Sequence, residues 1–306
     1  MTIAAVIGLG TMGPGIAATL ARGGMQVRVF DSSAAALERA RGAVAAAARV
    51  LEAIGGAPAA AAPGAVAYVD SLAAAMRDAD LAVEVVPENP AIKADVLAAM
   101  EAAARPDAIL ASNTSGIPIG RLQQAVRTPA RLIGMHWSNP PHVIPIVEVI
   151  PGAATDPAVA DRLTALVAAV GHKPVRINKD VAGFVHNRVL YALLREAVAL
   201  VEDGVIEPAA LDTLVKWSVG LKLSVIGPME LLDVAGLDIY RAVSSYLNAE
   251  LDRSTGVSPA IEQRVAAGAL GLKAGKGMYD YPAGAAEKLG AARAGKLVAV
   301  RKVLDG

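Results

Sequence analysis

Two residues capable of acid–base chemistry, His136 and Glu148, lie twelve positions apart in an otherwise apolar, proline-rich stretch. Glu148 interrupts the apolar run IPIVEVI, and a carboxylate there should be paired, because desolvating it alone is costly. If the two strands run side by side, Glu148 reaches one imidazole nitrogen of His136 and stabilises the protonated ring. The pair then suits a general base. The alternative is a core histidine with a satisfied hydrogen bond and a glutamate on an edge strand.

A glycine-rich turn near the N-terminus indicates nucleotide binding. Gly8, Gly10 and Gly13 form G-x-G-x-x-G between an apolar run and a helical pattern. They permit a tight turn, approach of a pyrophosphate to the backbone, and close packing of helix on strand. Asp31 lies 18 residues past Gly13, where an acid binds the ribose 2′-hydroxyl and repels a 2′-phosphate, so NAD is favoured. The alternative is an ordinary turn followed by a helix-capping aspartate. The predicted cofactor contacts in this region are Gly8, Gly10, Thr11, Met12, Gly13 and Asp31.

Strand-like and helical patterns alternate along the first part of the chain, which predicts a doubly wound sheet. After residue 178 the strand-like runs stop, and an amphipathic helix is predicted over residues 184–203. We therefore predict an α/β protein with an N-terminal Rossmann-like, mostly parallel sheet over residues 1–179 and an all-α C-terminal domain over residues 180–306. The strands are predicted at residues 3–7, 26–30, 81–86, 108–112, 131–136, 144–150 and 174–178.

The composition narrows the classes of partner and of site. Lys+Arg and Asp+Glu balance at 29 each, which gives no indication of a nucleic-acid or anionic-membrane partner. There is no cysteine, hence no disulfide, thiolate nucleophile or cysteine-based metal site, and we predict no metal centre. The chain has neither a signal-peptide pattern nor a run of about 18 apolar residues, so a cytoplasmic protein that acts on a small molecule is expected.

Seven separated motifs resemble the L-3-hydroxyacyl-CoA dehydrogenase family over essentially the whole length of the chain. Such a resemblance implies an NAD-dependent dehydrogenase whose all-α second domain mediates homodimerisation. The motifs are GLGTMGPG (8–15), VPEN (86–89), SNTSG (112–116), HWSNPP (136–141), KDVAGFVHNR (179–188), GPMELLDVAGLDIY (227–240) and GLKAGKGMYDY (271–281).

The family resemblance also implies roles for individual residues. His136 and Glu148 match its catalytic dyad, and Ser115, Asn139 and Asn187 match residues around the substrate oxygen. Simpler interpretations remain open: Ser115 as a helix cap and Asn187 as a satisfied interdomain polar group. On the cofactor side, the resemblance suggests Glu88 at the nicotinamide end, together with Asn113 and Lys93, although Lys93 alternatively reads as a solvated helix residue.

The chain departs from the acyl-CoA form of the family. That form reads HFFNPVPVMKLVE, whereas this chain reads HWSNPPHVIPIVE, closer to lambda-crystallin-type relatives that oxidise small hydroxy acids. No Lys or Arg lies between Arg49 and Arg77, although CoA phosphates need cations. Both departures argue against a CoA thioester substrate. A closer resemblance within the family, carried by HWSNPPH (136–142) and NRVLYALLREAV (187–198), implies a small carboxylated hydroxy or hydrated-aldehyde substrate, such as a pyridine aldehyde acid. Arg188, His142 and His186 are candidates to bind its carboxylate, although His142 and His186 alternatively read as solvent-facing loop and helix residues. The alternatives are an (S)-3-hydroxyacyl-CoA dehydrogenase and a non-catalytic NAD-binding protein of crystallin type.

Overall fold

The chain forms two compact units in a computed structural model that describes residues 2–55 and 62–305. The units comprise Met1–Arg188 and Val189–Gly306. The domain boundary that we predict after residue 179 stays a prediction. Most of the loop predicted at residues 55–64 falls on residues 56–61, which lie outside the described residues.

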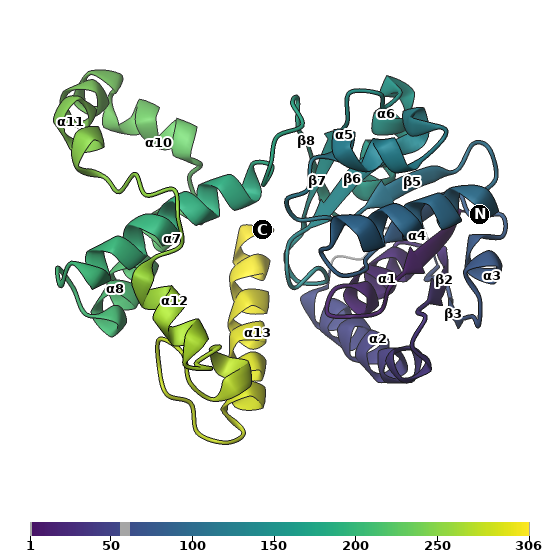
Figure 1. Cartoon of the computed structure of the whole chain (residues 1–306), viewed down its shortest axis with the longest axis horizontal. Coiled ribbons are helices and arrows are strands. Elements are labelled where there is room, and N and C mark those ends of the chain that lie inside the picture. Colours follow the sequence, from purple (N-terminus) through teal and green to yellow (C-terminus); the bar gives the residue numbers. More distant parts are fainter. Residues whose placement is uncertain (1, 56–61, 306) are drawn as a thin grey trace. The chain divides into compact units, whose positions relative to one another are not determined.

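The first unit is built on one sheet, which has eight strands within the described residues, in the order β3-β2-β1-β4-β5-β6-β7-β8 (Figure 1). All neighbouring pairs are parallel except β6 and β7. The connection between β6 and β7 contains no helix, and such a short connection joins antiparallel neighbours. The predicted doubly wound, mostly parallel sheet is confirmed. The strands are β1 (Ile3–Ile7), β2 (Gln26–Phe30), β3 (Val66–Tyr68), β4 (Leu81–Glu84), β5 (Ile109–Ser112), β6 (Leu132–Trp137), β7 (Ile146–Pro151) and β8 (Lys173–Arg176).

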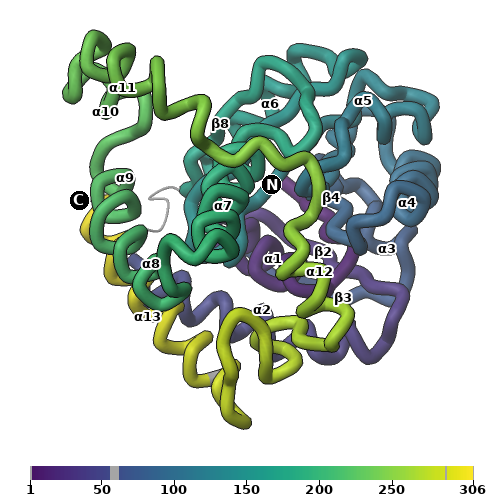
Figure 2. The backbone as a smooth tube through the Cα atoms, turned by 60° about the vertical axis from the view of Figure 1, so that its left-hand side comes forward, coloured from purple at the N-terminus to yellow at the C-terminus, as the bar shows by residue number. Residues whose placement is uncertain are grey.

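Helices cover both faces of this sheet because successive strand residues point to opposite sides. In β1, Ala4 and Val6 pack into the core with α1, α2 and α6, whereas Ala5 and Ile7 pack into a second core with α3, α4 and α5. α3 and α4 lie next to each other in both views of the backbone (Figures 1 and 2). The helices are α1 (Gly13–Arg22), α2 (Ala34–Ile54), α3 (Leu72–Met76), α4 (Pro90–Ala103), α5 (Ile119–Leu122) and α6 (Pro157–Ala169), with short 3-10 turns at Gln123–Ala125 and Pro129–Arg131.

The turn between β1 and α1 needs its first and third glycines for steric reasons. Gly8 has φ +104°, and a Cβ there would lie 2.7 Å from the carbonyl oxygen of Val85. A Cβ on Gly13 would lie 2.1 Å from the carbonyl oxygen of Gly8. Only glycine therefore lets α1 start this close to β1. Pro14 lies in the first helical turn, where its missing N–H costs little.

The second unit is helical, apart from two isolated bridges around Lys276. α10 and α11 lie next to each other in Figures 1 and 2. No residue of α7 to α12 is buried, although these helices carry many large apolar side chains. None of the helices in the described part of the chain is both long and apolar enough to cross a membrane. The elements are α7 (His186–Glu202), α8 (Pro208–Val215), a π-helical turn (Lys216–Gly220), α9 (Leu221–Leu223), α10 (Pro228–Ala235), α11 (Leu237–Glu250), α12 (Pro259–Ala266), a 3-10 turn (Leu272–Ala274) and α13 (Ala285–Leu304).

Candidate active site

The candidate site lies at the edge of the sheet where the parallel strands β4, β5 and β6 end. Open α/β sheets bind ligands at this carboxyl edge. Glu84 ends β4, Ser112 ends β5 as its register partner, and His136 is the second-last residue of β6. Polar side chains from three neighbouring strands are thereby brought together.

His136 and Glu148 are in direct contact, as the sequence predicts. They face each other across the antiparallel β6–β7 pair, and His136 Nδ1 lies 2.7 Å from Glu148 Oε2. Both side chains are buried. β7 lies between β6 and β8, so the alternative of a glutamate on an edge strand is wrong.

The second oxygen of Glu148 holds the segment that leads into α7. Oε1 accepts hydrogen bonds from the backbone N–H groups of Val185 and His186, both at 3.0 Å. These amides open a helix, where a carboxylate is favoured. The carboxylate therefore fixes both the imidazole and the start of α7.

These contacts keep Glu148 ionised. Burial alone would raise the pKa of its carboxyl, but the hydrogen bonds from His136, His186 and Val185 outweigh burial and hold the pKa below its ordinary value. An ionised carboxylate only accepts hydrogen bonds, so Nδ1 of His136 is the nitrogen that donates. This leaves Nε2 as the nitrogen that can take a proton from a substrate.

Two rings lie beside His136, and one of them contacts a serine. The ring of Phe184 lies 5.8 Å from the imidazole, and that of His186 lies 5.9 Å from it, edge to face. Nδ1 of His186 is 3.5 Å from the hydroxyl of Ser138, which is buried. Our sequence reasoning missed Ser138, although it stands where the acyl-CoA form has an aromatic residue.

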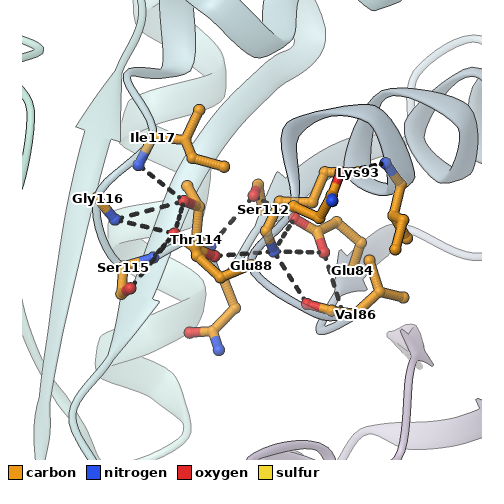
Figure 3. A network of polar contacts seen from close by, with 12 residues as sticks. Glu84, Val86, Glu88, Lys93, Ser112, Thr114, Ser115, Gly116 and Ile117 are labelled. Atoms are coloured by element: carbon orange, nitrogen blue, oxygen red, sulfur yellow. Dashed lines mark hydrogen bonds and ion pairs between the residues drawn. The ribbon is translucent and has the colours of Figure 1, made fainter. Parts of the chain in front are cut away.

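The loop after β5 wraps around the carboxylate of Glu88 (Figure 3). Glu88 Oε1 accepts hydrogen bonds from the Thr114 hydroxyl at 2.6 Å, from the Ser115 N–H and hydroxyl at 3.0 and 3.3 Å, and from the Gly116 N–H at 3.2 Å. No helix starts at Gly116, so the interpretation of Ser115 as a helix cap is wrong. Ser115 is instead held by the acid of the VPEN motif.

Lys93 is buried and lies between two carboxylates (Figure 3). Its Nζ is 3.0 Å from both oxygens of Glu84 and 3.4 Å from Glu88 Oε2. The interpretation of Lys93 as a solvated helix residue is therefore wrong. Our sequence reasoning missed Glu84, although it is a lone carboxylate in an apolar strand, the same signal that identified Glu148.

Asp31 lies beside the glycine turn, at the end of β2. Its Oδ2 accepts the Leu9 N–H at 2.7 Å, and its Oδ1 accepts the Ser33 N–H at 2.8 Å. The residue that caps α2 is Ser33, so the interpretation of Asp31 as the helix cap is wrong. Each oxygen of Asp31 keeps capacity for a further hydrogen bond, which suits a ribose diol.

The turn itself fits a dinucleotide. Gly10 and Thr11 are exposed, and a Cβ built on Gly10 would meet nothing within 4 Å. Open space at the second glycine is what an approaching pyrophosphate requires. Met12 stands at the N-cap of α1 and offers no side-chain cap, so free N–H groups face that space.

The remaining predicted residues lie on loops around this edge. The Asn113 side-chain oxygen accepts the Trp137 N–H at 2.9 Å, which ties the loop after β5 to β6. Asn187 donates its amide to the Ser115 carbonyl at 2.6 Å. Asn139 is exposed, two residues past the end of β6. Arg188 is exposed as well, in the first turn of α7.

His142 is less suited to binding an anion than the sequence suggests. Burial lowers its pKa, and its Nδ1 is buried without a hydrogen-bond partner among the described residues. A neutral imidazole offers a substrate carboxylate a hydrogen bond but no charge. Within the described residues, no group of three or more His, Asp or Glu is arranged to hold a metal ion.

Comparison with known proteins places this arrangement in a family. The family model described as "3-hydroxyacyl-CoA dehydrogenase, NAD binding domain" matches residues 3–181, and the model for the C-terminal domain of these dehydrogenases matches residues 183–281. The chain belongs to the 3-hydroxyacyl-CoA dehydrogenase family. The predicted family, the Rossmann-like fold with a helical second part, and NAD as the cofactor are confirmed, and the protein is an NAD-dependent oxidoreductase.

Several relatives are similar over nearly the whole chain. A Mesorhizobium japonicum protein, 5-formyl-3-hydroxy-2-methylpyridine 4-carboxylate 5-dehydrogenase, is 53% identical over 302 residues, 99% of this chain and 98% of that relative. Motifs such as HWSNPPH and NRVLYALLREAV indicate the same resemblance. A solved structure of such a dehydrogenase, described as an NAD+-dependent dismutase, is 52% identical with a TM-score of 0.97, and the match covers 100% of this chain and 99% of the other. A probable 3-hydroxybutyryl-CoA dehydrogenase of Deinococcus radiodurans is 38% identical over 280 residues, 90% of this chain and 99% of the relative.

Proposed function

We propose that the protein oxidises a small carboxylated hydroxy or hydrated-aldehyde substrate, such as a pyridine aldehyde acid, with NAD as oxidant. The observation that carries this proposal is the 2.7 Å contact between His136 and Glu148 at the edge of the sheet where its nucleotide-binding turn also lies. The 53% identity to a pyridine-aldehyde dehydrogenase supports the substrate class.

His136 acts as the general base. A hydrated aldehyde is an alcohol, and its oxidation to the acid removes one proton from oxygen and one hydride from carbon. Nε2 of His136 takes the proton, while the ionised Glu148 stabilises the imidazolium that results. NAD, when bound, supplies the hydride acceptor.

The loops around His136 hold the reacting groups. Ser115 and Asn139 bind the substrate oxygen as hydrogen-bond donors, and Asn187 supports Ser115 through the bond to its carbonyl. On the cofactor side, Gly8, Gly10, Thr11, Met12 and Gly13 bind the pyrophosphate. Asp31 binds the adenosine ribose. Glu88, Lys93 and Asn113 lie at the nicotinamide end.

The substrate carboxylate is bound by Arg188. The guanidinium of Arg188 presents a fork of donors that matches a carboxylate. His142, whose pKa is lowered by burial, contributes a hydrogen bond, and His186 lies beside His136 to do the same. This assignment explains why residues that can bind a carboxylate surround the site, although the chain lacks the basic segment that CoA phosphates need.

An (S)-3-hydroxyacyl-CoA substrate is the second candidate. The relative of that kind from Deinococcus radiodurans is 38% identical, against 53% for the pyridine-aldehyde dehydrogenase. The stretch without Lys or Arg between Arg49 and Arg77 also argues against it. A non-catalytic, crystallin-type role does not require an acid–base pair as well placed as His136 and Glu148.

The protein also forms a homodimer through its second unit. Trp217 is 72% exposed and Tyr191 is 66% exposed, although both are large apolar residues of helical segments. Exposed apolar surface on this scale is characteristic of an interaction face, and a second copy of the same unit would cover it. A cytoplasmic location stays a prediction from the sequence.

A substrate panel tests the proposed activity. Purified protein is supplied with NAD and, in turn, pyridine aldehyde acids, small 3-hydroxy acids and 3-hydroxyacyl-CoAs, and NADH absorbance is followed. We expect the highest kcat/KM with a carboxylated aldehyde. Faster turnover of an acyl-CoA would replace the substrate assignment, and no turnover with any of them would favour the non-catalytic role.

A further inference from the structure

A fully buried carboxylate, Glu84, lies beneath the candidate site and touches no surface that a ligand can reach. It is 0% exposed, and its partner Lys93 is 1% exposed. A buried ion pair is seldom needed for stability, because apolar residues of the same volume usually serve as well. Its position under the loops of the site therefore calls for a functional explanation.

Glu84 is held on all sides by donors. Its carboxylate receives two 3.0 Å contacts from the Lys93 ammonium, a hydrogen bond from the Val86 N–H at 3.1 Å and another from the Ser112 hydroxyl. Burial still raises the pKa of Glu84, because desolvation outweighs these attractions. The donors thus hold the carboxyl group of Glu84 in a fixed position, at a cost in desolvation.

Lys93 links Glu84 to Glu88. The ammonium also donates to the Val86 carbonyl at 3.2 Å and lies 3.4 Å from Glu88 Oε2. An ammonium has three donors, and these partners use them all. The contacts to Glu84 and Val86 fix the place from which Lys93 presents its charge to Glu88.

Glu88 in turn gathers the loop that carries Ser115. One oxygen faces Lys93, and the other receives the four hydrogen bonds from Thr114, Ser115 and Gly116. These bonds and Lys93 together outweigh burial, so the pKa of Glu88 lies below its ordinary value. Glu88 itself is 42% exposed and is open to the cofactor.

We propose that Glu84 is a positioning residue of the reaction, acting through Lys93 and Glu88 to hold the Ser115 loop and the nicotinamide end of the cofactor site (Figure 3). The inference rests on the proposed function for the roles of Ser115 and Glu88. It adds a role for the buried pair of Glu84 and Lys93. The pair fixes the geometry of groups at the surface of the site, and one residue, Glu88, separates it from any ligand.

The first test replaces the charge and keeps the shape. We expect Glu84→Gln to raise the dissociation constant for NADH and to lower kcat, each by about tenfold, the loss expected from one charged hydrogen bond. NADH binding is measured by fluorescence titration well below the melting temperature of each variant, and that temperature is measured by thermal melting. If Glu84→Gln folds poorly, Ser112→Ala removes one donor to Glu84, together with the acceptor of the Thr114 N–H at 3.1 Å, and should change NADH binding in the same direction by a smaller factor.

The matched control is Glu101→Gln. Glu101 is also a buried carboxylate and accepts the N–H groups of Arg127 and Thr128 at 2.7 Å each, but it lies near the far end of α4. This variant should lose stability without a change in NADH affinity or kcat. The proposal would be overturned if Glu84→Gln and Ser112→Ala bound NADH as tightly as the Glu101→Gln control and the wild type.

A double variant separates positioning from stability. Glu84→Leu with Lys93→Met replaces the ion pair by an apolar pair, so the melting temperature should recover relative to Glu84→Leu alone. NADH affinity and kcat should stay as low as in Lys93→Met alone, because Glu88 has lost its cation and Glu84 acts only through Lys93. Recovery of all three together would show a purely structural pair and would contradict the proposal.

The same measurements distinguish this inference from the proposed function. NADH binding needs no substrate, so the positioning effect is measurable even if the assigned substrate class is wrong. A wild-type protein that binds NADH but turns over no substrate defeats the proposed function alone. Unchanged NADH binding in the Glu84 and Ser112 variants of an active enzyme defeats the inference alone.

Discussion

At the scale of single residues, the site depends on three carboxylates, each of which contacts hydrogen-bond donors or a cation. Glu148 holds an imidazole and two amides, Glu88 holds a loop, and Glu84 holds an ammonium. Each of them is partnered by groups from other segments of the chain. The electrostatics of the site therefore depend on tertiary structure more than on any one motif.

Glu148 should contribute stability that depends on pH. Its pKa in the folded protein lies below the ordinary value of 4.5, so the contribution is full above about pH 4.5 and is lost as pH falls through the lowered pKa. We expect Glu148→Gln to lower the free energy of unfolding by about 1–3 kcal/mol near neutral pH. Urea unfolding of both proteins across the acid range checks this. The difference should shrink as pH falls, and a difference independent of pH would contradict the assignment.

The sequence predicts some of these residues better than others. A lone carboxylate in an apolar strand correctly indicates that Glu148 is paired, and the short strand spacing identifies His136 as its partner. The same signal at Glu84 has a partner on a helix, and Lys93 looks solvent-exposed when α4 is considered by itself. Only the packing of α4 on the sheet shows that this lysine is buried.

At the scale of elements, the turn between β1 and α1 combines two requirements that the G-x-G-x-x-G pattern does not separate. Gly13 has no room for a side chain, whereas Gly10 has open space around it. The first is a requirement of the fold, and we attribute the second to the ligand.

Two alanine variants should separate these requirements. Gly13→Ala places a Cβ against the Gly8 carbonyl and should lower the melting temperature markedly. Gly10→Ala meets nothing in the protein, so its melting temperature should stay near that of the wild type while NADH affinity falls about tenfold or more. Thermal melting and NADH titration measure the two effects. A Gly10→Ala variant that binds NADH normally would argue against pyrophosphate binding at this turn.

The sequence predicts most strands of the sheet but misses two short elements. The alternation of strands and helices gives the sheet and its mostly parallel character, because the apolar runs are distinct. The sequence does not predict β3 and α3, since β3 has only three residues, none of them buried, and α3 has five residues. Elements this short owe their formation to the neighbours they pack on, and their own sequence carries little signal.

At the scale of the whole molecule, the second unit exposes many large apolar side chains. We expect the wild-type protein to sediment as a dimer. Trp217→Lys and Tyr191→Lys should each shift it toward the monomer, because burying such a side chain contributes about 1.5–3 kcal/mol. Asn248→Lys, an exposed polar position on α11, is the control and should remain dimeric. Analytical ultracentrifugation measures all four, and a monomeric wild type would refute the dimer.

The central claim is that His136, oriented by Glu148, removes the substrate proton. The most direct measurement is the turnover of His136→Gln with NAD and a carboxylated aldehyde, together with its NADH affinity. We expect kcat to fall by about 10²–10⁴-fold, the usual contribution of a general base, while NADH binding is preserved. Turnover equal to that of the wild type would contradict it.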